Sequence, residues 1–208
     1  MYIPKHFQMN DTSEQLDFIR QYSFGDLITT YQGKLEINHA PFLLADNDEY
    51  LLVHFARNNP HWQVVEKADE LKVCFKGPDC YISPNWYTEP AKNVPTWNFL
   101  SVQVTGHASL MSDDELIHLL DQLSQKHEAQ FSHPWTIEKL SEQQLAAMVK
   151  AIVGVKISIE KISGKAKLSQ NKSQREITSL LDGLAKQADF GSRAVLEWMK
   201  PLKHVQQA

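Results

Sequence analysis

The sequence predicts an α+β protein that is mainly β, with strands in its first half and helices in its second. Between residues 25 and 104, short runs of β-branched and aromatic residues alternate with turn residues. From residue 112 on, apolar residues recur at helical spacing and follow polar capping signals. The spacing of the strands suits a barrel, and 208 residues are enough for one large domain with its own core.

The N-terminal half is expected to open with a short helix and to continue in strands. Asp11 and Thr12 are N-cap candidates for a helix over residues 13–22, and a helical turn or two is expected over residues 58–65. The expected strands cover residues 27–31, 35–45, 50–55, 71–75, 81–83 and 97–104. Because polar turns join the first three strands, we expect an antiparallel meander there, whereas Gly/Pro turns divide the later strands.

Capping boxes open the helices of the second half. The boxes at residues 112–115, 141–144 and 173–176 each precede an apolar stripe, and the first of these helices should reach about residue 128. Residues 155–162 alternate apolar and polar side chains, which predicts a late strand that closes the sheet. A last short helix is expected over residues 192–199.

Charge and cysteine content restrict the possible partners and compartment. Lys and Arg number 21 against 25 Asp and Glu, so the formal net charge is −4 and any anion site should be local. Cys74 and Cys80 lack Cys-x-x-Cys spacing and are interpreted as reduced thiols near strand ends. The N-terminus lacks the apolar run of a signal peptide, and no run of about 18 apolar residues occurs. We therefore expect a soluble, cytoplasmic protein without membrane contact.

Several familiar chemistries find no support in the sequence. It has no Gly-x-Gly-x-x-Gly motif, no Walker loop and no Gly-x-Ser-x-Gly motif, which argues against the common dinucleotide-binding, nucleotide-hydrolysing and serine hydrolase folds. The histidines form neither a helical i, i+4 pair nor a Cys/His cluster. They are interpreted as scattered polar or half-buried side chains, and no metal site is predicted.

Residues 75–98 combine flat aromatic side chains with amides and prolines. Trp86, Tyr87, Trp97 and Asn98 lie in this window, among prolines that fix the backbone φ angle. Such a surface suits a planar ligand with polar edges. The same residues would also serve as core aromatics between turns, and this window alone does not decide between the two interpretations.

Two other segments are candidates for an anion site. His54, Arg57 and Asn58 lie where an expected strand ends and a helical turn begins, and Arg binds phosphate oxygens in pairs. A solvated Arg beside an Asn turn is the alternative. Residues 156–175 hold six Lys or Arg and one acid, Glu160, which predicts a local positive patch. A solvated loop that enters a helix would have the same composition.

Nine segments, in their order along the chain, resemble those of a known family. They are residues 1–7, 54–62, 75–78, 81–84, 86–87, 94–98, 134–135, 151–154 and 167–171. Val-Pro-Thr-Trp-Asn at 94–98 and Lys-Leu-Ser-Gln-Asn at 167–171 are unusual strings, so the resemblance is specific. From residue 1 to about residue 185, the chain resembles the PaiB family of FMN-binding negative transcriptional regulators. It departs at Phe99, where members often have Tyr, and beyond Lys186, where no motif matches.

The resemblance implies a fold, a cofactor and an assembly. The implied fold is an FMN-binding split β-barrel of the flavin reductase and pyridoxamine-phosphate oxidase type, with peripheral helices and a helical C-terminal segment. The implied assembly is a homodimer with FMN sites between the subunits. We expect the barrel to cover residues 1–170 and the helical extension to cover residues 171–208, packed on the barrel or on its dimer partner.

The resemblance also places the flavin site in these segments, without fixing the role of each side chain. The predicted site residues are His54, Arg57, Asn58, Trp86, Trp97, Asn98, Lys167, Ser169, Gln170 and Asn171. Arg57 is the first candidate for the FMN phosphate and Lys167 the second, from the same or the other subunit. The amide side chains suit ribityl hydroxyls or ring carbonyls, and the two tryptophans suit stacking against the ring. No catalytic residue is predicted.

The preferred function is that of an FMN-binding regulatory protein, a negative regulator of transcription. The alternative is an FMN-dependent oxidoreductase, similar to flavin reductase or pyridoxamine-phosphate oxidase, that acts on an unknown small molecule. A third interpretation is a structural dimer that no longer binds flavin. Because no helix-turn-helix and no basic recognition helix is found, we expect weak, salt-sensitive, sequence-independent DNA binding, with repression acting through flavin or a DNA-binding partner protein.

Overall fold

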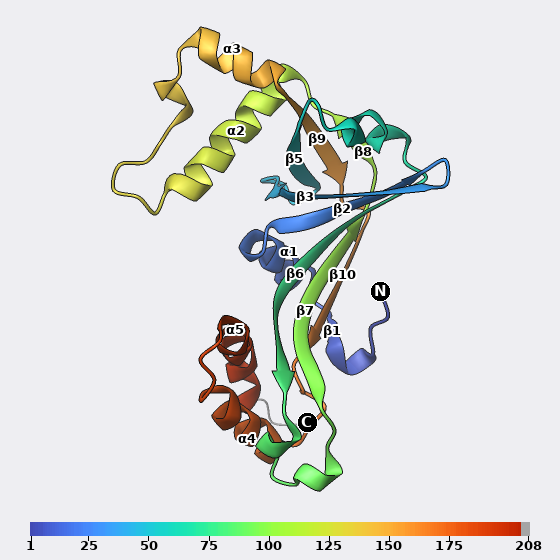
Figure 1. Cartoon of the computed structure of the whole chain (residues 1–208), viewed down its shortest axis with the longest axis vertical. Coiled ribbons are helices and arrows are strands. Elements are labelled where there is room, and N and C mark those ends of the chain that lie inside the picture. The colour runs from blue at the N-terminus through green and yellow to red at the C-terminus, as the bar shows by residue number, and fades with distance from the viewer. Residues whose placement is uncertain (205–208) are drawn as a thin grey trace. The chain divides into compact units, whose positions relative to one another are not determined.

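The computed structural model describes residues 1–204 and confirms the predicted class, an α+β protein that is mainly β (Figure 1). Within these residues the ten strands are β1 Gln8–Met9, β2 Phe24–Tyr31, β3 Lys34–Pro41, β4 Leu43–Leu44, β5 Tyr50–Ala56, β6 Glu70–Ile82, β7 Thr96–Thr105, β8 Ala108–Leu110, β9 Ile152–Ser158 and β10 Lys161–Lys167. The five α-helices are α1 Thr12–Gln21, α2 Asp113–Glu128, α3 Glu142–Lys150, α4 Gln174–Leu184 and α5 Phe190–Met199. Among residues 1–204, every helix is too short or too polar to cross a membrane.

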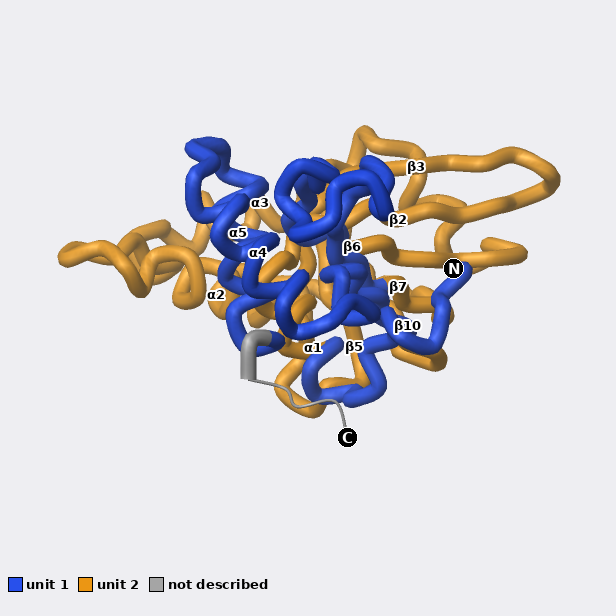
Figure 2. The backbone as a smooth tube through the Cα atoms, turned by 90° about the horizontal axis from the view of Figure 1, so that it is seen from below, with its two compact units in different colours: residues 1–15, 76–102, 163–208 blue, residues 16–75, 103–162 orange. Residues whose placement is uncertain are grey.

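The described chain separates into two compact units whose segments alternate along the sequence (Figure 2). Unit 1 consists of Met1–Gln15, Lys76–Val102 and the described residues from Ser163 on. Unit 2 consists of Leu16–Phe75 and Gln103–Ile162. The expected boundary at residue 170 stays a prediction. Helices α4 and α5 lie in the expected C-terminal extension, of which residues 205–208 fall outside the described residues.

Unit 2 contains an antiparallel four-stranded sheet with the order β4-β5-β9-β8. In its central pair, Val53 lies opposite Val155, and both side chains are fully buried. Helices α2 and α3 begin at the predicted capping boxes and pack beside β9 (Figure 1). One core cluster of this unit consists of Leu43, Leu116, Leu119 and Val149.

Unit 1 contains β1 and parts of β10, β7 and β6, which lie in the order β1-β10-β7-β6, with Met9 opposite Gly164 in the first pair. Helix α4 buries one apolar stripe, as its sequence period predicts. Trp86 packs directly on this helix, because a Cβ atom at Gly183 would lie 2.5 Å from Trp86 Cγ. The glycine therefore makes room for the indole, and one predicted site residue has a packing role.

The predicted three-stranded meander is wrong in its third strand. Strand β3 pairs with β2, but β5 pairs with β4 and β9 in the other sheet. The run over residues 35–45 is broken after Pro41, which cannot donate to a strand ladder, and the Phe42 N–H donates to Ser23 O at 2.8 Å. The break lets the chain leave one sheet and enter the second.

Two other strand boundaries differ from expectation. Strand β6 runs unbroken through Pro78 because its pairing with β2 ends at Gly25–Phe75, so the proline lies where β2 no longer needs a donor. Both cysteines lie within β6 and are free thiols: Cys80 is two residues from the strand end, as expected, whereas Cys74 lies in the strand interior. The single strand expected over residues 155–162 is two strands, because the Ile159 N–H donates to Glu49 O and the Glu160 N–H to Thr105 O.

The third capping box is half formed. The Ser173 hydroxyl accepts the Glu176 N–H and caps α4 as predicted. The Glu176 carboxylate instead accepts the Thr88 N–H at 2.9 Å and the Thr88 hydroxyl. These contacts lower the pKa of Glu176, the hydroxyl contact contributing most. The glutamate thus connects α4 to the segment that follows Trp86.

Candidate functional site

A tight loop in unit 1 follows strand β10 and precedes α4. Ser169 has a φ of +63°, which is rare for a residue with a side chain and is typical of functional loops. Gln170 holds the loop closed, since its Nε2 donates to Ala166 O at 2.6 Å and its Oε1 accepts the Leu168 N–H at 2.8 Å. The Lys172 N–H donates to Ser169 O at 3.0 Å and completes the turn. The loop is therefore defined by its own hydrogen bonds.

This loop borders a pocket of about 280 Å³ within unit 1. The pocket is lined by Phe7, Tyr87, Asn93, Val94, Thr96, Lys167, Ser169, Asn171 and Lys172. Lys167, Ser169 and Asn171 are predicted site residues, and they occupy alternate positions of one short segment. The structure thus brings together three of the ten predicted residues and adds Lys172 beside them.

Two ammonium groups donate hydrogen bonds to neutral acceptors at this pocket, and the charge of Lys172 also interacts with Glu176. Lys167 Nζ donates to Trp97 O at 2.7 Å and to the Thr96 hydroxyl, and it forms no ion pair among residues 1–204. Burial, and to a smaller extent the charge of Lys165, lowers the pKa of Lys167. Lys172 Nζ donates to Asn93 Oδ1 at 2.8 Å and lies 5.2 Å from the centre of the Tyr87 ring. An anion in the pocket would relieve the unfavourable burial of positive charge.

Asn98 lies beneath the loop rather than in the pocket. Its side chain is fully buried, its Oδ1 accepts the Ser169 hydroxyl at 3.1 Å, and its Nδ2 donates to the Met199 sulfur at 3.4 Å. Trp97, the preceding residue on β7, faces outward with 54% of its surface exposed. Its ring meets the Tyr81 ring edge to face at 6.2 Å. Asn98 therefore positions Ser169, whereas Trp97 offers an open aromatic surface.

The predicted phosphate residue of unit 2 has structural contacts. Arg57 Nε donates to Lys150 O at 2.7 Å, and its Nη2 donates to Ile152 O at 2.8 Å. The guanidinium lies 5.9 Å from the Trp62 ring centre, and Trp62 Nε1 donates to Arg57 O at 2.8 Å. The fork that would bind a phosphate thus holds the chain end of α3 and the start of β9, while Asn58 is exposed beside it.

The rest of the same segment forms a buried polar network. His61 is 1% exposed, its Nε2 lies 2.7 Å from the Thr29 hydroxyl, and its Nδ1 lies 2.7 Å from Asn38 Nδ2. Asn38 Oδ1 accepts from Asn59 Nδ2 at 2.8 Å, which fixes the orientation of the Asn38 amide. Asn38 therefore donates to Nδ1, and His61 is the neutral tautomer with its proton on Nε2. Burial lowers the pKa of His61, in agreement with a neutral ring.

The comparisons with known proteins define the family. Residues 1–161 match the family described as "Putative FMN-binding domain". "Protease synthase and sporulation protein PAI 2" of Bacillus subtilis is 37% identical over 202 residues, which cover 96% of this chain and 97% of the relative. The chain belongs to the PaiB family. Membership confirms the expectation of a flavin cofactor, since the family is defined by an FMN-binding domain.

Solved structures share the fold of this PaiB-family chain at low sequence identity. A hypothetical protein, Rv2991, of Mycobacterium tuberculosis matches with a TM-score of 0.60 at 14% identity, over 83% of this chain and 94% of the other. The FAD and heme binding protein of Mycobacterium smegmatis matches with a TM-score of 0.59 at 14% identity, over 77% and 73% of the two chains. At these identities the likeness shows the fold alone.

His54, another of the predicted flavin-site residues, belongs neither to the unit 1 pocket nor to the polar network around His61. It is half-buried on β5 opposite Gly154, and its Nδ1 is buried without a hydrogen-bond partner among the described residues. Burial lowers its pKa. The PaiB-family resemblance included His54 through its motif, but the side-chain hydrogen bonds of Arg57 go to Lys150 O and Ile152 O rather than to His54.

Sequence reasoning missed several residues of the unit 1 pocket. Tyr87 and Asn93 lie in the aromatic window, and Lys172 lies in the basic segment, so both signals were present. The sequence alone does not show that these two segments lie side by side in the fold. Burial raises the pKa of Tyr87, so its phenol stays protonated and able to donate. Among the described residues, no group of three or more His, Cys, Asp or Glu side chains is arranged to hold a metal ion.

Proposed function

We propose that this PaiB-family chain is an FMN-binding regulatory protein whose unit 1 pocket holds the phosphate end of FMN. One observation supports this most directly. Two ammonium groups, a hydroxyl and an amide converge on one pocket at a loop with a left-handed serine. FMN has a dianionic phosphate and a ribityl chain of hydroxyls, and this set of donors matches both.

Each pocket residue is proposed to have a distinct part. Lys167 and Lys172 bind the phosphate oxygens, because they carry the positive charge of the pocket. Ser169 and Asn171 bind ribityl hydroxyls, and the exposed face of Trp97 borders the ring system. Asn98 and Gln170 are positioning residues, since their contacts hold the loop. Bound FMN would supply a ring that can be oxidised and reduced.

We also propose that the complete flavin site belongs to a homodimer. The pocket of about 280 Å³ lies below the usual range for ligand sites, about 300–1,000 Å³, so it suits the phosphate end better than the whole cofactor. Trp97 and Tyr81 present an exposed aromatic pair in the same unit, 54% and 43% exposed. A second copy would cover this apolar surface. Light scattering at micromolar concentration should give twice the chain mass, and a monomer mass would contradict the dimer.

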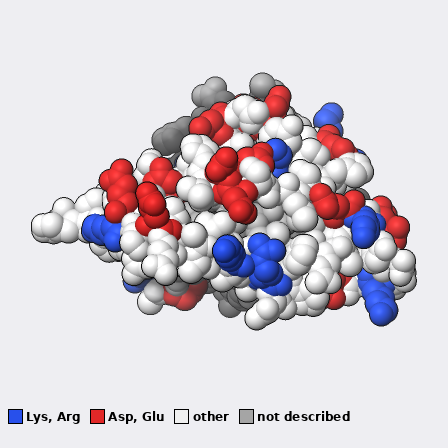
Figure 3. Space-filling model, turned by 90° about the horizontal axis from the view of Figure 1, so that it is seen from above, with Lys and Arg blue, Asp and Glu red and all other residues white. Residues whose placement is uncertain are grey.

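The proposed regulation acts through the flavin or a partner protein rather than through a DNA-reading helix. The name of the Bacillus subtilis relative connects that protein with sporulation and protease synthesis, which supports a regulatory role by likeness. Figure 3 shows acidic and basic side chains interspersed over the drawn face, without a broad positive surface. The basic segment around Lys167 and Lys172 is engaged at the pocket. Lys167 and Lys172 are then not available to bind a duplex.

The test is a spectrum and a titration of the purified protein. We expect a bound-flavin absorbance spectrum, quenching of FMN fluorescence on titration, and no steady oxidation of NADH or NADPH. Turnover of a nicotinamide cofactor would make the protein an oxidoreductase instead. Absence of FMN binding would contradict the proposal and favour a structural dimer. A promoter preference over scrambled DNA of about 10³-fold or more, at near-physiological salt, would establish direct repression.

A further inference from the structure

Helix α5 lies beyond residues 1–161, which match the FMN-binding domain, yet it reaches the proposed flavin site. The helix packs beside α4 in unit 1 (Figure 1) and buries Ser192, Val195 and Met199, which recur at helical spacing. Met199 is the last residue of the helix and has no exposed surface. This end of α5 contacts a polar side chain that supports the pocket loop.

The contact is a hydrogen bond between Asn98 of β7 and Met199. Asn98 Nδ2 donates to the Met199 sulfur at 3.4 Å, and both side chains are fully buried. A thioether sulfur accepts hydrogen bonds and cannot donate them, so it determines which end of the amide faces α5. The Asn98 oxygen then faces the loop, where it accepts the Ser169 hydroxyl at 3.1 Å.

The orientation of the amide determines what Ser169 presents to the pocket. Because the hydroxyl proton of Ser169 is donated to Asn98, the lone pairs of its oxygen remain for a ligand. Ser169 lines the pocket and has the left-handed backbone described above. A hydroxyl held in this way accepts hydrogen bonds, and the ribityl hydroxyls of FMN can donate them. The sulfur on α5 therefore sets the hydrogen-bonding character of a pocket residue.

The wall of the pocket at Tyr87 is anchored on α4, the helix against which α5 packs. The Ser179 hydroxyl of α4 donates to Trp86 O at 2.7 Å. The Glu176 carboxylate of α4 accepts the Thr88 N–H at 2.9 Å. Tyr87 lies between these two anchored residues and is buried. The helical pair therefore holds both the loop and one wall of the pocket.

We propose that α5 is coupled to the flavin pocket and that Met199 is the positioning residue that couples them. This coupling rests on the proposed flavin site and adds a regulation of that site. Docked α5 orients Asn98 and Ser169 and so strengthens FMN binding. Bound FMN stabilises docked α5 by the same factor, because coupling between two sites is reciprocal. Flavin occupancy is thereby transmitted to a helix whose first residue, Phe190, is 84% exposed.

The first test is a fluorescence titration of the full-length protein with FMN. Met199→Leu keeps a similar side-chain volume but removes the acceptor, and the FMN dissociation constant should rise about threefold to tenfold. Asn98→Ala should raise it at least as much. Because Met199 acts through Asn98, the double variant should bind FMN as Asn98→Ala does, to within about twofold. Two independent changes would instead multiply their effects.

The second test measures the coupling in the reverse direction. Saturating FMN should slow amide hydrogen exchange in residues 190–199 by about threefold to tenfold in the unchanged protein. The slowing should disappear in Met199→Leu. A methionine that only fills space would not make the exchange of α5 depend on FMN, so this measurement separates positioning from packing.

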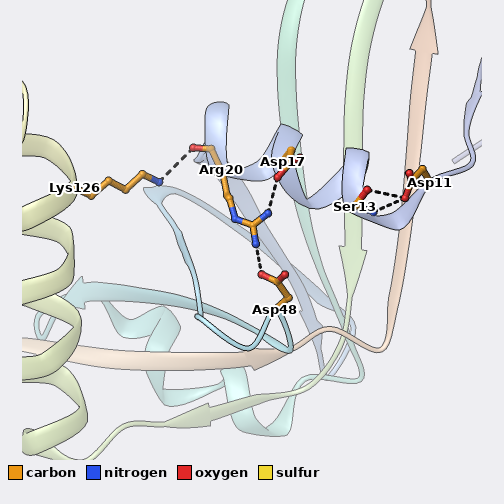
Figure 4. Close-up of polar contacts among 6 residues, drawn as sticks. All are labelled: Asp11, Ser13, Asp17, Arg20, Asp48 and Lys126. Carbon is orange, nitrogen blue, oxygen red and sulfur yellow. Dashed lines mark hydrogen bonds and ion pairs between the residues drawn. The ribbon is translucent and has the colours of Figure 1, made fainter.

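Two controls separate positioning from a general loss of stability. Figure 4 shows Arg20 of α1 between Asp17 and Asp48, with hydrogen bonds from its two terminal nitrogens. Arg20→Met breaks these ion pairs in unit 2 and should leave the FMN dissociation constant unchanged. Met9→Leu makes the same substitution as Met199→Leu at another buried methionine of unit 1, and should also leave it unchanged. Urea unfolding verifies that each variant is folded.

Three results would overturn the coupling while the flavin site stands. The first is an FMN dissociation constant that Met199→Leu leaves unchanged although Lys167→Met raises it. The second is exchange in α5 that does not respond to FMN. The third is a control variant that weakens FMN binding as much as Met199→Leu does. Absence of FMN binding by the unchanged protein would contradict the proposed function itself, and the coupling with it.

Discussion

Two segments of this chain carry similar side chains but use them differently. Residues 57–62 of unit 2 and residues 167–172 of unit 1 both combine a cationic side chain with amides next to the end of a strand. In the first, Arg57 donates to main-chain carbonyls and His61 sits in a closed network. In the second, Lys167 donates to the Trp97 carbonyl and Lys172 donates to the Asn93 amide, at the edge of a pocket.

The difference lies in how far the polar groups satisfy one another. Around His61, each side-chain donor meets an acceptor, so the network stabilises the fold and has little capacity for a ligand. At the pocket, positive charge is buried without a carboxylate on Lys167, and the loop backbone is strained at Ser169. Residue type alone suggests a phosphate site in both segments. The hydrogen bonds that each segment already makes favour residues 167–172.

The largest expected effect is on stability at His61. His61→Leu leaves the buried Thr29 hydroxyl and the Asn38 amide without a partner, which should reduce the free energy of unfolding by about 2–4 kcal/mol. Urea unfolding measures the loss, and Asn58→Ala, in the same segment but exposed, is the control and should change it by less than about 0.5 kcal/mol. Equal effects of the two changes would mean that the network does not stabilise the fold.

The pH dependence of stability should follow the same network. Burial lowers the pKa of His61 in the folded state below its usual 6.5, so the unfolded chain takes up the proton first. Stability is full above about pH 6.5 and falls as the pH decreases below it, by at most about 1.4 kcal/mol per pH unit for this histidine. Unfolding between about pH 7.5 and pH 5.5 should show a steeper decline in the unchanged protein than in His61→Leu. His54, whose pKa burial also lowers, contributes the remaining slope.

The smallest expected effect is that of Arg57 on flavin. Arg57→Met removes the hydrogen bonds to Lys150 O and Ile152 O, which are exposed, and should reduce the free energy of unfolding by about 0.5–1.5 kcal/mol. The affinity for FMN should change by less than about twofold. Fluorescence titration of the folded variant measures this affinity. A loss of affinity of about tenfold or more would mean that Arg57 binds the FMN phosphate.

Much of the fold follows from local signals in the sequence. The boxes at Ser112 and Ser141 determine where α2 and α3 begin, because the capping hydrogen bonds involve only residues three apart. The break at Pro41 and the turn at Ile159 were not predicted, since each depends on which strand the chain pairs with next. The Glu176 contact with Thr88 likewise joins residues 88 positions apart.

The candidate site likewise contains some residues that the sequence predicted and some that it did not. Lys167, Ser169 and Asn171 were found because the string that contains them is distinctive. Asn93 and Tyr87 were missed because they reach the pocket through the pairing of distant segments. The hydrogen bonds from Arg57 to main-chain carbonyls could not be predicted from the residues next to it in the sequence, since the acceptors lie 93 and 95 residues further along the chain.

The central claim is that the phosphate end of FMN binds at Lys167, and one titration tests it most directly. Lys167→Met keeps the length of the side chain and removes its charge, while Lys161→Met, on the same strand, is the matched control. The account predicts that the FMN dissociation constant rises about tenfold to a hundredfold in Lys167→Met, from the loss of about 1.5–3 kcal/mol, and is unchanged in Lys161→Met. An unchanged dissociation constant in a folded Lys167→Met protein would contradict the account.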